Sequence, residues 1–194
     1  MDAAPTAAAT HVAEWMLEAA LGTTNAADAF AGMLERLRHQ GLQIDRAQIA
    51  YTTLHPLNHG SGATWRAATG LEVTDYANDS EESLNGWLES PVRYVVTNQI
   101  ERLRRRLIGP GAMLDFPILE DLADEGFADY ILFAQAFESF YAINEGNPDA
   151  ADSATAGMTC SFATSRPEGL TDEEVSTLAW LIRPLAMMVK MADQ

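Results

Sequence analysis

Residues 51–70, which read YTTLHPLNHGSGATWRAATG, determine how the middle of the chain folds. The residues that lead into them, AQIAYTTL, show the period of two that is typical of a β-strand. Pro56 then removes a backbone donor, and Gly60 and Gly62 supply turn residues. The stretch therefore predicts a strand, a loop and a second strand that begins around Trp65, which together form a β-hairpin.

His55 and His59 lie in the loop of this hairpin, where an enzyme or a metal site could keep its chemistry. A His-x-x-x-His pair binds a metal best when both rings lie on one helical face, and Pro56 argues against that geometry. Neither a cysteine pair nor a helical His–Glu set supplies further ligands. We expect no metal and no cofactor, and we interpret His55 as a polar group able to face a ligand pocket.

The charge of the chain excludes some classes of partner. Its 194 residues include 28 acidic and 12 basic side chains, which gives a net charge of −16. Such a surface repels nucleic acid and anionic membranes, so neither is an expected partner. The arginines of ERLRRRL, residues 101–107, are expected to form a solvated or ion-paired face rather than an anion site. The length fits one domain, and a 47% share of hydrophobic residues suffices for a buried core.

Cys160 is the single cysteine, so no internal disulfide can form. No positively charged leader with an apolar core opens the sequence, and no apolar run reaches the roughly 18 residues that cross a bilayer. A cytoplasmic location is expected. Cys160 lies in the strand-like stretch MTCSFAT, where a small buried hydrophobe is the common role and a reactive thiol the rarer one.

Helical patterns begin and end the chain. TAAATHVAEWMLEAALGTT and AADAFAGMLERLRHQG predict two helices that end at Gly22 and Gly41. LTDEEVSTLAWLIRPLAMMVKMADQ predicts a long helix, which Thr171 and Glu174 begin with a capping box and Pro184 bends. An apolar stripe in it has the spacing of a coiled-coil seam, so dimerisation and packing on the same domain are both open. The stripe consists of Val175, Leu178, Ile182, Leu185 and Val189.

The segments between the hairpin and the last helix alternate in type. SPVRYVV predicts a helix with Ser90 as its N-cap and Pro91 in its first position. FPILEDLADEG predicts a short helix that ends at Gly126, and FADYILFAQAF and GMTCSFATS predict strands. Periodicity leaves IERLRRRLI, residues 100–108, open between a continued helix and a strand.

Four aromatic side chains could line an apolar pocket, although each is more commonly part of a core: Trp65, Trp87, Tyr130 and Phe133. Polar or reactive groups near the hairpin and on the last strand complete the candidate ligand site. The candidate site consists of His55, Trp65, Arg66, Trp87, Tyr130, Phe133 and Cys160.

Four stretches together resemble the regulatory region that precedes the catalytic domain in many bacterial class III adenylate/guanylate cyclases. They are TLHPLNHGSGATWR, SPVRYVV followed by LRRRLIGPG, DFPILEDLADEGFADYILF, and SFATSRPEGLTDEEVSTLAWLIRPLA. The resemblance runs from about residue 28 to 190. It implies an α+β, GAF-like fold: a central antiparallel sheet flanked by helices, with N-terminal helices and a long C-terminal helix. It also implies a helix at residues 90–97 and a strand at 100–108.

The resemblance divides the chain into an N-terminal helix, residues 1–24, and a GAF-like sensor and dimerisation domain, residues 25–194. It implies that a small-ligand or redox signal passes through the terminal helices to a C-terminal cyclase domain that makes cAMP or cGMP. A homodimer would form through those helices. The metal-binding aspartates and the transition-state Asn and Arg of the catalytic domain have no counterpart here, so this chain alone is not expected to be an enzyme.

Two other hypotheses remain open. The chain could be a free-standing enzyme that acts on a small molecule with His55, Arg66 and Cys160 in one pocket. It could also be a dimerisation scaffold with a filled core and no ligand. A small molecule that co-purifies with the protein would separate the sensor from the scaffold.

Overall fold

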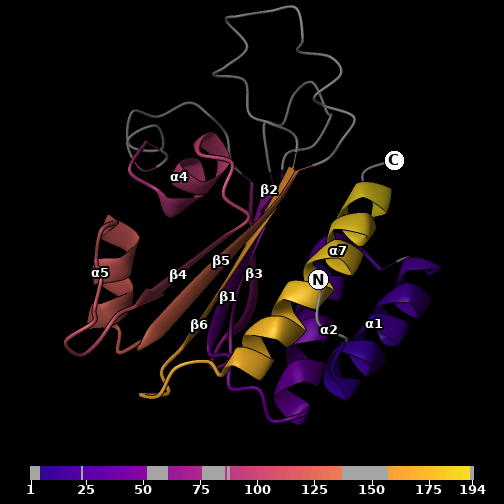
Figure 1. The fold of residues 1–194 in the computed structure, drawn as a ribbon. Coiled ribbons are helices and arrows are strands. Elements are labelled where there is room, and N and C mark those ends of the chain that lie inside the picture. Colours follow the sequence, from indigo (N-terminus) through magenta and orange to yellow (C-terminus); the bar gives the residue numbers. More distant parts are fainter. Residues whose placement is uncertain are drawn as a thin grey trace, which may run out of the picture.

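A central antiparallel sheet organises the protein. The computed structural model describes residues 5–22, 24–51, 61–75, 86, 88–136 and 157–192. The strands in these parts are β1 (Arg46–Tyr51), β2 (Ser61–Arg66), β3 (Gly70–Asp75), β4 (Arg102–Arg106), β5 (Asp129–Ala136) and β6 (Gly157–Thr164). The helices are α1 (Ala7–Ala20), α2 (Ala26–His39), α4 (Pro91–Thr97), α5 (Pro117–Asp124) and α7 (Asp172–Ala192). The six strands lie in the order β3-β2-β1-β6-β5-β4, with helices on both faces, which confirms the α+β class (Figure 1).

The predicted hairpin is present, with two differences in its second half. Strand β2 begins at Ser61 rather than around Trp65, so Gly62 lies in the strand and pairs with Ala50. Strands β1 and β2 pair antiparallel, and Ala47 lies opposite Trp65. The stretch ATWRAATGLEV, however, forms two strands, because residues 67–69 make a tight turn that Gly70 closes with a positive φ of 82°. Strand β3 is one edge of the sheet, and β4 is the other. His55 and His59 lie outside the described residues.

The segment that periodicity left open folds as a helix and then a strand, as the resemblance implies. Ser90 caps α4 by accepting a hydrogen bond from the Arg93 amide at 3.1 Å. The helix cannot continue, because Gln99 takes a positive φ of 53° before β4. Leu103 and Leu107 are both buried on one side of the sheet. A spacing of four residues fits a helical stripe and one face of a strand equally well, which is why periodicity could not decide.

Three helices, α1, α2 and α7, cover one face of the sheet, which we call the bundle face (Figure 1). Both N-terminal helices were predicted, and they begin at the N-caps Thr6 and Asn25. α1 and α7 pack against each other, and the hydroxyls of Thr6 and Thr177 lie 2.8 Å apart. Val12 of α1 is fully buried in the same cluster as α2, α7 and the sheet.

The capping box predicted for the last helix is confirmed. The Thr171 amide donates to Glu174 Oε2 at 2.7 Å, and the Glu174 amide donates to Thr171 Oγ1 at 3.2 Å. Pro184 lies inside α7, which continues past it. The whole apolar stripe predicted from Val175 to Val189 is buried in the bundle-face core, so it packs on its own domain.

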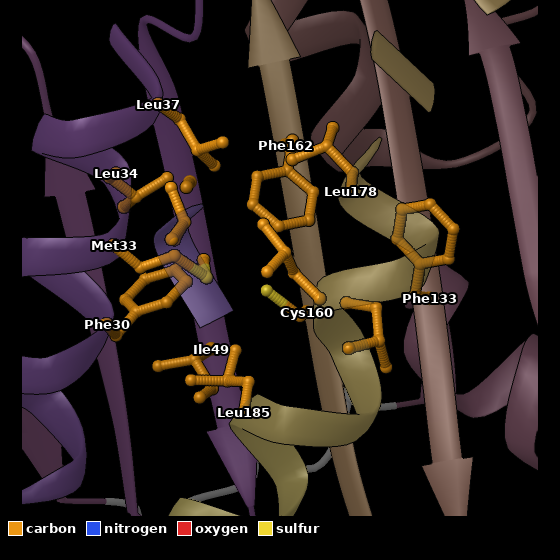
Figure 2. Close-up of a cluster of buried hydrophobic side chains, with 14 of the residues drawn as sticks. Phe30, Met33, Leu34, Leu37, Ile49, Phe133, Cys160, Phe162, Leu178 and Leu185 are labelled. Atoms are coloured by element: carbon orange, nitrogen blue, oxygen red, sulfur yellow. The ribbon is translucent and has the colours of Figure 1, made fainter. Parts of the chain in front are cut away.

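Two hydrophobic clusters lie on opposite faces of the sheet. Figure 2 shows the larger one, in which side chains of α2 and α7 meet Ile49, Phe133, Cys160 and Phe162 of the strands. The smaller one joins α4 and α5 to β4 and β5, with Ala163 as the member from β6. None of the helices in the described parts of the chain is long and apolar enough to span a membrane.

Candidate ligand-binding face

The side of the sheet opposite the bundle carries polar side chains on three of its strands. Alternation along β1, β2 and β6 sends one set of residues to the bundle core and the next set to the other side. In the strand register, Gln48 lies opposite both Thr64 and Ser161, so these three form one row across the sheet. We call this set the polar face. It consists of Arg46, Gln48, Thr64, Arg66, Thr159 and Ser161.

The polar face lies beside an apolar half of the same surface. Helices α4 and α5 pack over β4, β5 and Ala163, with Leu119 and Leu122 fully buried there. Leu132 of β5 lies opposite Ser161 of β6, so the apolar and polar halves meet along this pair of strands. The surface therefore offers apolar contact on one side and hydrogen-bonding groups on the other, a combination common in small-molecule sites.

Several groups of the polar face are buried. Arg46, Thr159 and Ser161 expose 7%, 9% and 4% of their surface. A buried polar group is costly unless it is hydrogen-bonded. Arg46 Nη2 donates to Gln48 Oε1 at 3.3 Å. Arg46 and Gln48 are therefore held in place within the fold, as a binding site requires.

Tyr130 joins the two halves. Its ring is buried in the α4–α5 cluster, and its hydroxyl hydrogen-bonds with Ser161. Burial raises the pKa of Tyr130 to about 12, although the Ser161 bond and the positive charge of Arg46 act the other way. The phenol therefore stays protonated at neutral pH and can donate or accept a hydrogen bond, but it cannot serve as a base.

Arg66 marks one border of the polar face. Its Nη1 and Nη2 atoms lie 2.6 and 3.3 Å from the two carboxylate oxygens of Glu125, at the C-terminal end of α5. The hydrogen bond from Arg66 lowers the pKa of Glu125. This two-point ion pair ties β2 to α5, so the Arg66 guanidinium is already engaged by the protein.

The structure separates the residues of the predicted site. Tyr130 and Arg66 lie on the side of the polar face, whereas Trp65, Phe133 and Cys160 are buried in the bundle-face core. Figure 2 shows Phe133 and Cys160 among the core side chains. His55 and Trp87 lie outside the described residues. The predicted site placed Trp65 and Arg66 together, although neighbours along a strand point to opposite faces of the sheet.

Cys160 lies where its thiol meets only apolar neighbours. It is fully buried, and burial raises the pKa of the thiol well above its usual value. The thiol is therefore neutral and packs as a small hydrophobe.

Sequence reasoning missed most of the polar face, although a signal was present. In RAQIAY the polar Arg46 and Gln48 alternate with Ala47 and Ile49, and GMTCSFAT alternates in the same way through Ser161. Polar residues at every second position of a strand that is buried on both sides would have indicated this face.

A groove between α4 and α5 is a second candidate feature. This groove of about 450 Å³ is lined by ten residues that include Arg93, Tyr94, Asp115 and Phe116. The Tyr94 and Phe116 rings lie 5.5 Å apart in a tilted arrangement. Asp115 is paired with Arg105 Nη2 at 2.8 Å, and that hydrogen bonding lowers its pKa. In the described parts of the chain, no three His, Cys, Asp or Glu side chains gather where they could hold a metal ion.

Asp129 connects β5 to the start of α7. Its buried carboxylate accepts a hydrogen bond from the Leu170 amide at 2.9 Å and from Arg104 Nη2 at 2.6 Å. Arg104 Nη2 also donates to the Leu170 carbonyl at 2.6 Å. A side chain at Gly169 would collide with Arg106 and Asp129, so the turn before α7 fits this carboxylate closely. Of the four arginines in ERLRRRL, Arg104 and Arg106 pair with Asp129, Arg105 pairs with Asp115, and Arg102 is exposed, which agrees with the predicted solvated or ion-paired face.

Comparisons place this architecture among known folds. No family model and no curated protein matches the sequence. The structure is similar to a phycocyanobilin-bound GAF domain from a cyanobacterial phytochrome, at 12% identity and a TM-score of 0.54, over 95% of this chain and 94% of that one. It is also similar to the GAF domain of a two-component sensor histidine kinase from Bacillus halodurans, at 10% identity and a TM-score of 0.52, over 83% and 90%.

A third similar structure is the chromophore-binding domain of a bacteriophytochrome from R. palustris, at 14% identity and a TM-score of 0.51. The match covers 94% of this chain and 61% of that one. The fold is therefore GAF-like, as the sequence resemblance implies. At these identities the likeness establishes the fold alone.

Proposed function

We propose that this chain is the regulatory domain of a class III adenylate/guanylate cyclase, and that it senses a small molecule on its polar face. The observation that carries the proposal is the burial of Arg46, Thr159 and Ser161 on one side of strands whose other side is apolar. Polar residues at core positions cost stability compared with apolar ones, so their presence favours a role in recognition. Two of the similar structures, a phytochrome GAF domain with a bound bilin and the GAF domain of a sensor kinase, support a sensory role.

The signal would pass from the polar face to the start of α7 through two consecutive residues of β5, Asp129 and Tyr130. Tyr130 points to the polar-face side, and Asp129 holds Leu170 and Arg104 on the other side. A ligand that moves the Tyr130 hydroxyl would shift β5 and hence the carboxylate that fixes the start of α7. The ligand can bias this change only by binding one of the two arrangements more tightly.

The cyclase part of the proposal rests on the sequence resemblance. SFATSRPEGLTDEEVSTLAWLIRPLA runs from Ser161 in β6, through the turn held by Asp129, to Ala186 in the capped helix α7. These are the elements that would pass a signal to a C-terminal catalytic domain. The reading frame beyond residue 194 is expected to encode that domain, and an unrelated domain there would overturn the cyclase assignment while leaving the sensory one.

A small ligand is favoured over a redox signal. Cys160 is fully buried among apolar side chains, and the raised pKa of its thiol keeps it in the unreactive form. The enzyme hypothesis gains no support from Arg66 and Cys160, because these side chains lie on opposite faces of the sheet.

Native mass spectrometry of the freshly purified protein tests the sensory proposal. The wild-type chain is expected to carry an additional small-molecule mass, and Ser161→Val to lose it, because the change removes one hydroxyl of the polar face. Ser176→Val, which makes the same change on the exposed side of α7, is the matched control and is expected to keep it. A bare chain mass, together with no thermal shift from any compound of a metabolite library, would favour the scaffold instead.

A further inference from the structure

The groove between α4 and α5 is separate from the polar face. Both helices lie on the side of the sheet opposite the bundle (Figure 1). The groove has a volume of about 450 Å³, within the range of roughly 300–1,000 Å³ that small-molecule sites occupy. None of the ten residues that line it belongs to the polar face. Val95 of α4 is buried against the strands and does not line the groove, which follows another side of the helix.

Two aromatic rings face each other across this groove. Tyr94 comes from α4 and Phe116 from the residue that precedes α5, and their ring centroids lie 5.5 Å apart at an interplanar angle of 59°. Tyr94 is 41% exposed, and Leu88, at 44%, adds apolar surface beside it. Aromatic rings attract further rings in offset or edge-to-face arrangements. The groove therefore favours a ligand with a flat aromatic group.

The wall formed by Asp115 and Phe116 is fixed to the sheet. Arg105 of β4 donates from Nε to Asp115 Oδ1 at 3.0 Å and from Nη2 to Asp115 Oδ2 at 2.8 Å. Arg105 Nη1 also donates to the Arg104 carbonyl at 3.0 Å, which holds the guanidinium in place. The groove is thus formed in advance on this side. The Asp115 charge is balanced by Arg105, so it adds no free negative charge to the groove.

Glu89 and Arg93 supply the remaining charges of the groove. Both are exposed, and in the described parts of the chain neither forms an ion pair. Arg93 Nη1 reaches only the Leu88 carbonyl, at 3.4 Å. Arg93 also lies in the first turn of α4, where a positive charge opposes the helix dipole, so it does not stabilise the helix. One positive and one negative side chain are therefore available to a ligand beside the aromatic pair.

We propose that this groove binds an aromatic α-amino acid. Its ring would lie against Tyr94 and Phe116, its carboxylate would face Arg93, and its ammonium group would face Glu89. An α-amino acid carries both charges on one carbon atom, next to the side chain that bears the ring. An aromatic acid without an amine would set a negative charge beside Glu89, and an aromatic amine would set a positive charge beside Arg93, which is unfavourable in both cases.

This inference goes beyond the proposed function, because it adds a second ligand site on different residues. An amino acid in the groove would join α4 to the start of α5. The other end of α5 is bonded to the polar face, through Glu125 and Arg66. The groove could therefore act as a second input that changes the border of the polar face. Ser161→Val, which removes a polar-face hydroxyl, is expected to leave binding in the groove unchanged, so the two proposals fail separately.

An NMR titration of the ¹⁵N-labelled protein with L-tryptophan tests the proposal. The backbone amides of Tyr94, Thr97 and Asn98, all in the groove, are expected to shift as the amino acid binds. Three matched probes each lack one group: indole-3-propionate lacks the amine, tryptamine the carboxylate, and L-alanine the ring. Each is expected to bind at least about threefold more weakly than L-tryptophan, the effect of one partly exposed charge pair or one ring contact.

Two single-charge variants assign the groups. Glu89→Gln and Arg93→Gln are each expected to weaken L-tryptophan binding at least about threefold. Arg93→Gln should leave the affinity for tryptamine unchanged, and Glu89→Gln that for indole-3-propionate, because each of these probes lacks the group that the lost charge would bind. Arg102→Gln is the matched control, since this exposed arginine of β4 does not line the groove. Circular dichroism confirms that each variant is folded.

Three outcomes would overturn the proposal. The first is that no groove amide shifts at L-tryptophan concentrations up to about 20 mM, which excludes even a weak site. The second is that L-tryptophan, tryptamine and indole-3-propionate bind with equal affinity, which excludes the roles of Glu89 and Arg93. The third is that the shifts appear at Gln48 and Ser161 and disappear in Ser161→Val, which places the amino acid on the polar face instead.

Discussion

The two faces of the sheet use the same strands for different purposes. On the bundle face Ile49, Cys160 and Phe162 meet α2 and α7 in an apolar core, while one residue away on the same strands Gln48 and Ser161 form part of the polar face. The first arrangement is what stability alone requires. The second costs stability, and we propose that it serves recognition. The comparison predicts that changes on the bundle face unfold the protein and changes on the polar face affect binding.

The largest effect is expected for Phe162→Ala. Phe162 is 1% exposed in the bundle-face core, and a large-to-small change at such a site costs about 3–5 kcal/mol of unfolding free energy. Urea denaturation measures this loss. Ser161→Ala is the neighbouring control on the other face, with an expected cost of about 1 kcal/mol. Similar costs for the two variants would contradict the division between the faces.

Asp129→Asn is expected to have the next largest effect. The change keeps the shape of the side chain but removes the charge that pairs with Arg104, and breaking a buried pair costs about 3 kcal/mol. The amide exchange rate of Leu170, measured by NMR, should rise more than that of amides in α2. A stability within 0.5 kcal/mol of wild type, roughly the scatter expected at a surface site, would argue against a role in fixing α7.

A smaller effect on stability is expected for Tyr130→Phe, which keeps the ring and removes the hydroxyl that bonds to Ser161. The loss of one hydrogen bond costs about 1 kcal/mol. The account predicts that occupancy by the co-purifying molecule, read by native mass spectrometry, falls severalfold. Unchanged occupancy would place the ligand elsewhere.

The smallest effect concerns the partly exposed pair of Arg105 and Asp115. The hydrogen bonds from Arg105 lower the pKa of Asp115 in the folded state, so its contribution is complete above the unfolded pKa of about 3.9 and is lost as pH falls through the lower folded value. Both groups are partly exposed, which limits the effect to about 1 kcal/mol. Stability measured from pH 6 down to 2 should fall less steeply in Asp115→Asn than in wild type. Parallel curves would show that the pair contributes nothing.

The elements were largely predictable because their signals are local. The capping box of Thr171 and Glu174, the N-cap Ser90 and the turn glycines determine their own backbone surroundings. Whether the Val175–Val189 stripe packs on its own domain or forms a dimer depends on distant contacts. The stripe is buried because α1, α2 and the sheet pack on it. No pattern within the stripe could distinguish those partners from a second chain.

The candidate site was harder to predict for the same reason. Aromatic and reactive side chains drew attention to Trp65, Phe133 and Cys160, all of which are core. The register of the strands decides which side of the sheet is buried against the helices and which residues of distant strands lie together. In the structure it brings Arg46 and Gln48 of β1 beside Ser161 of β6. Asp129 has no local signal, because its partner Leu170 lies 41 residues away.

The central claim is that binding on the polar face reaches α7 through Asp129. Hydrogen exchange at the Leu170 amide, with and without the co-purifying small molecule, tests it most directly. The account predicts at least a severalfold change in exchange on binding, which Asp129→Asn abolishes although the molecule still binds. An exchange rate at Leu170 that stays the same in the wild-type chain when the site is saturated would contradict it.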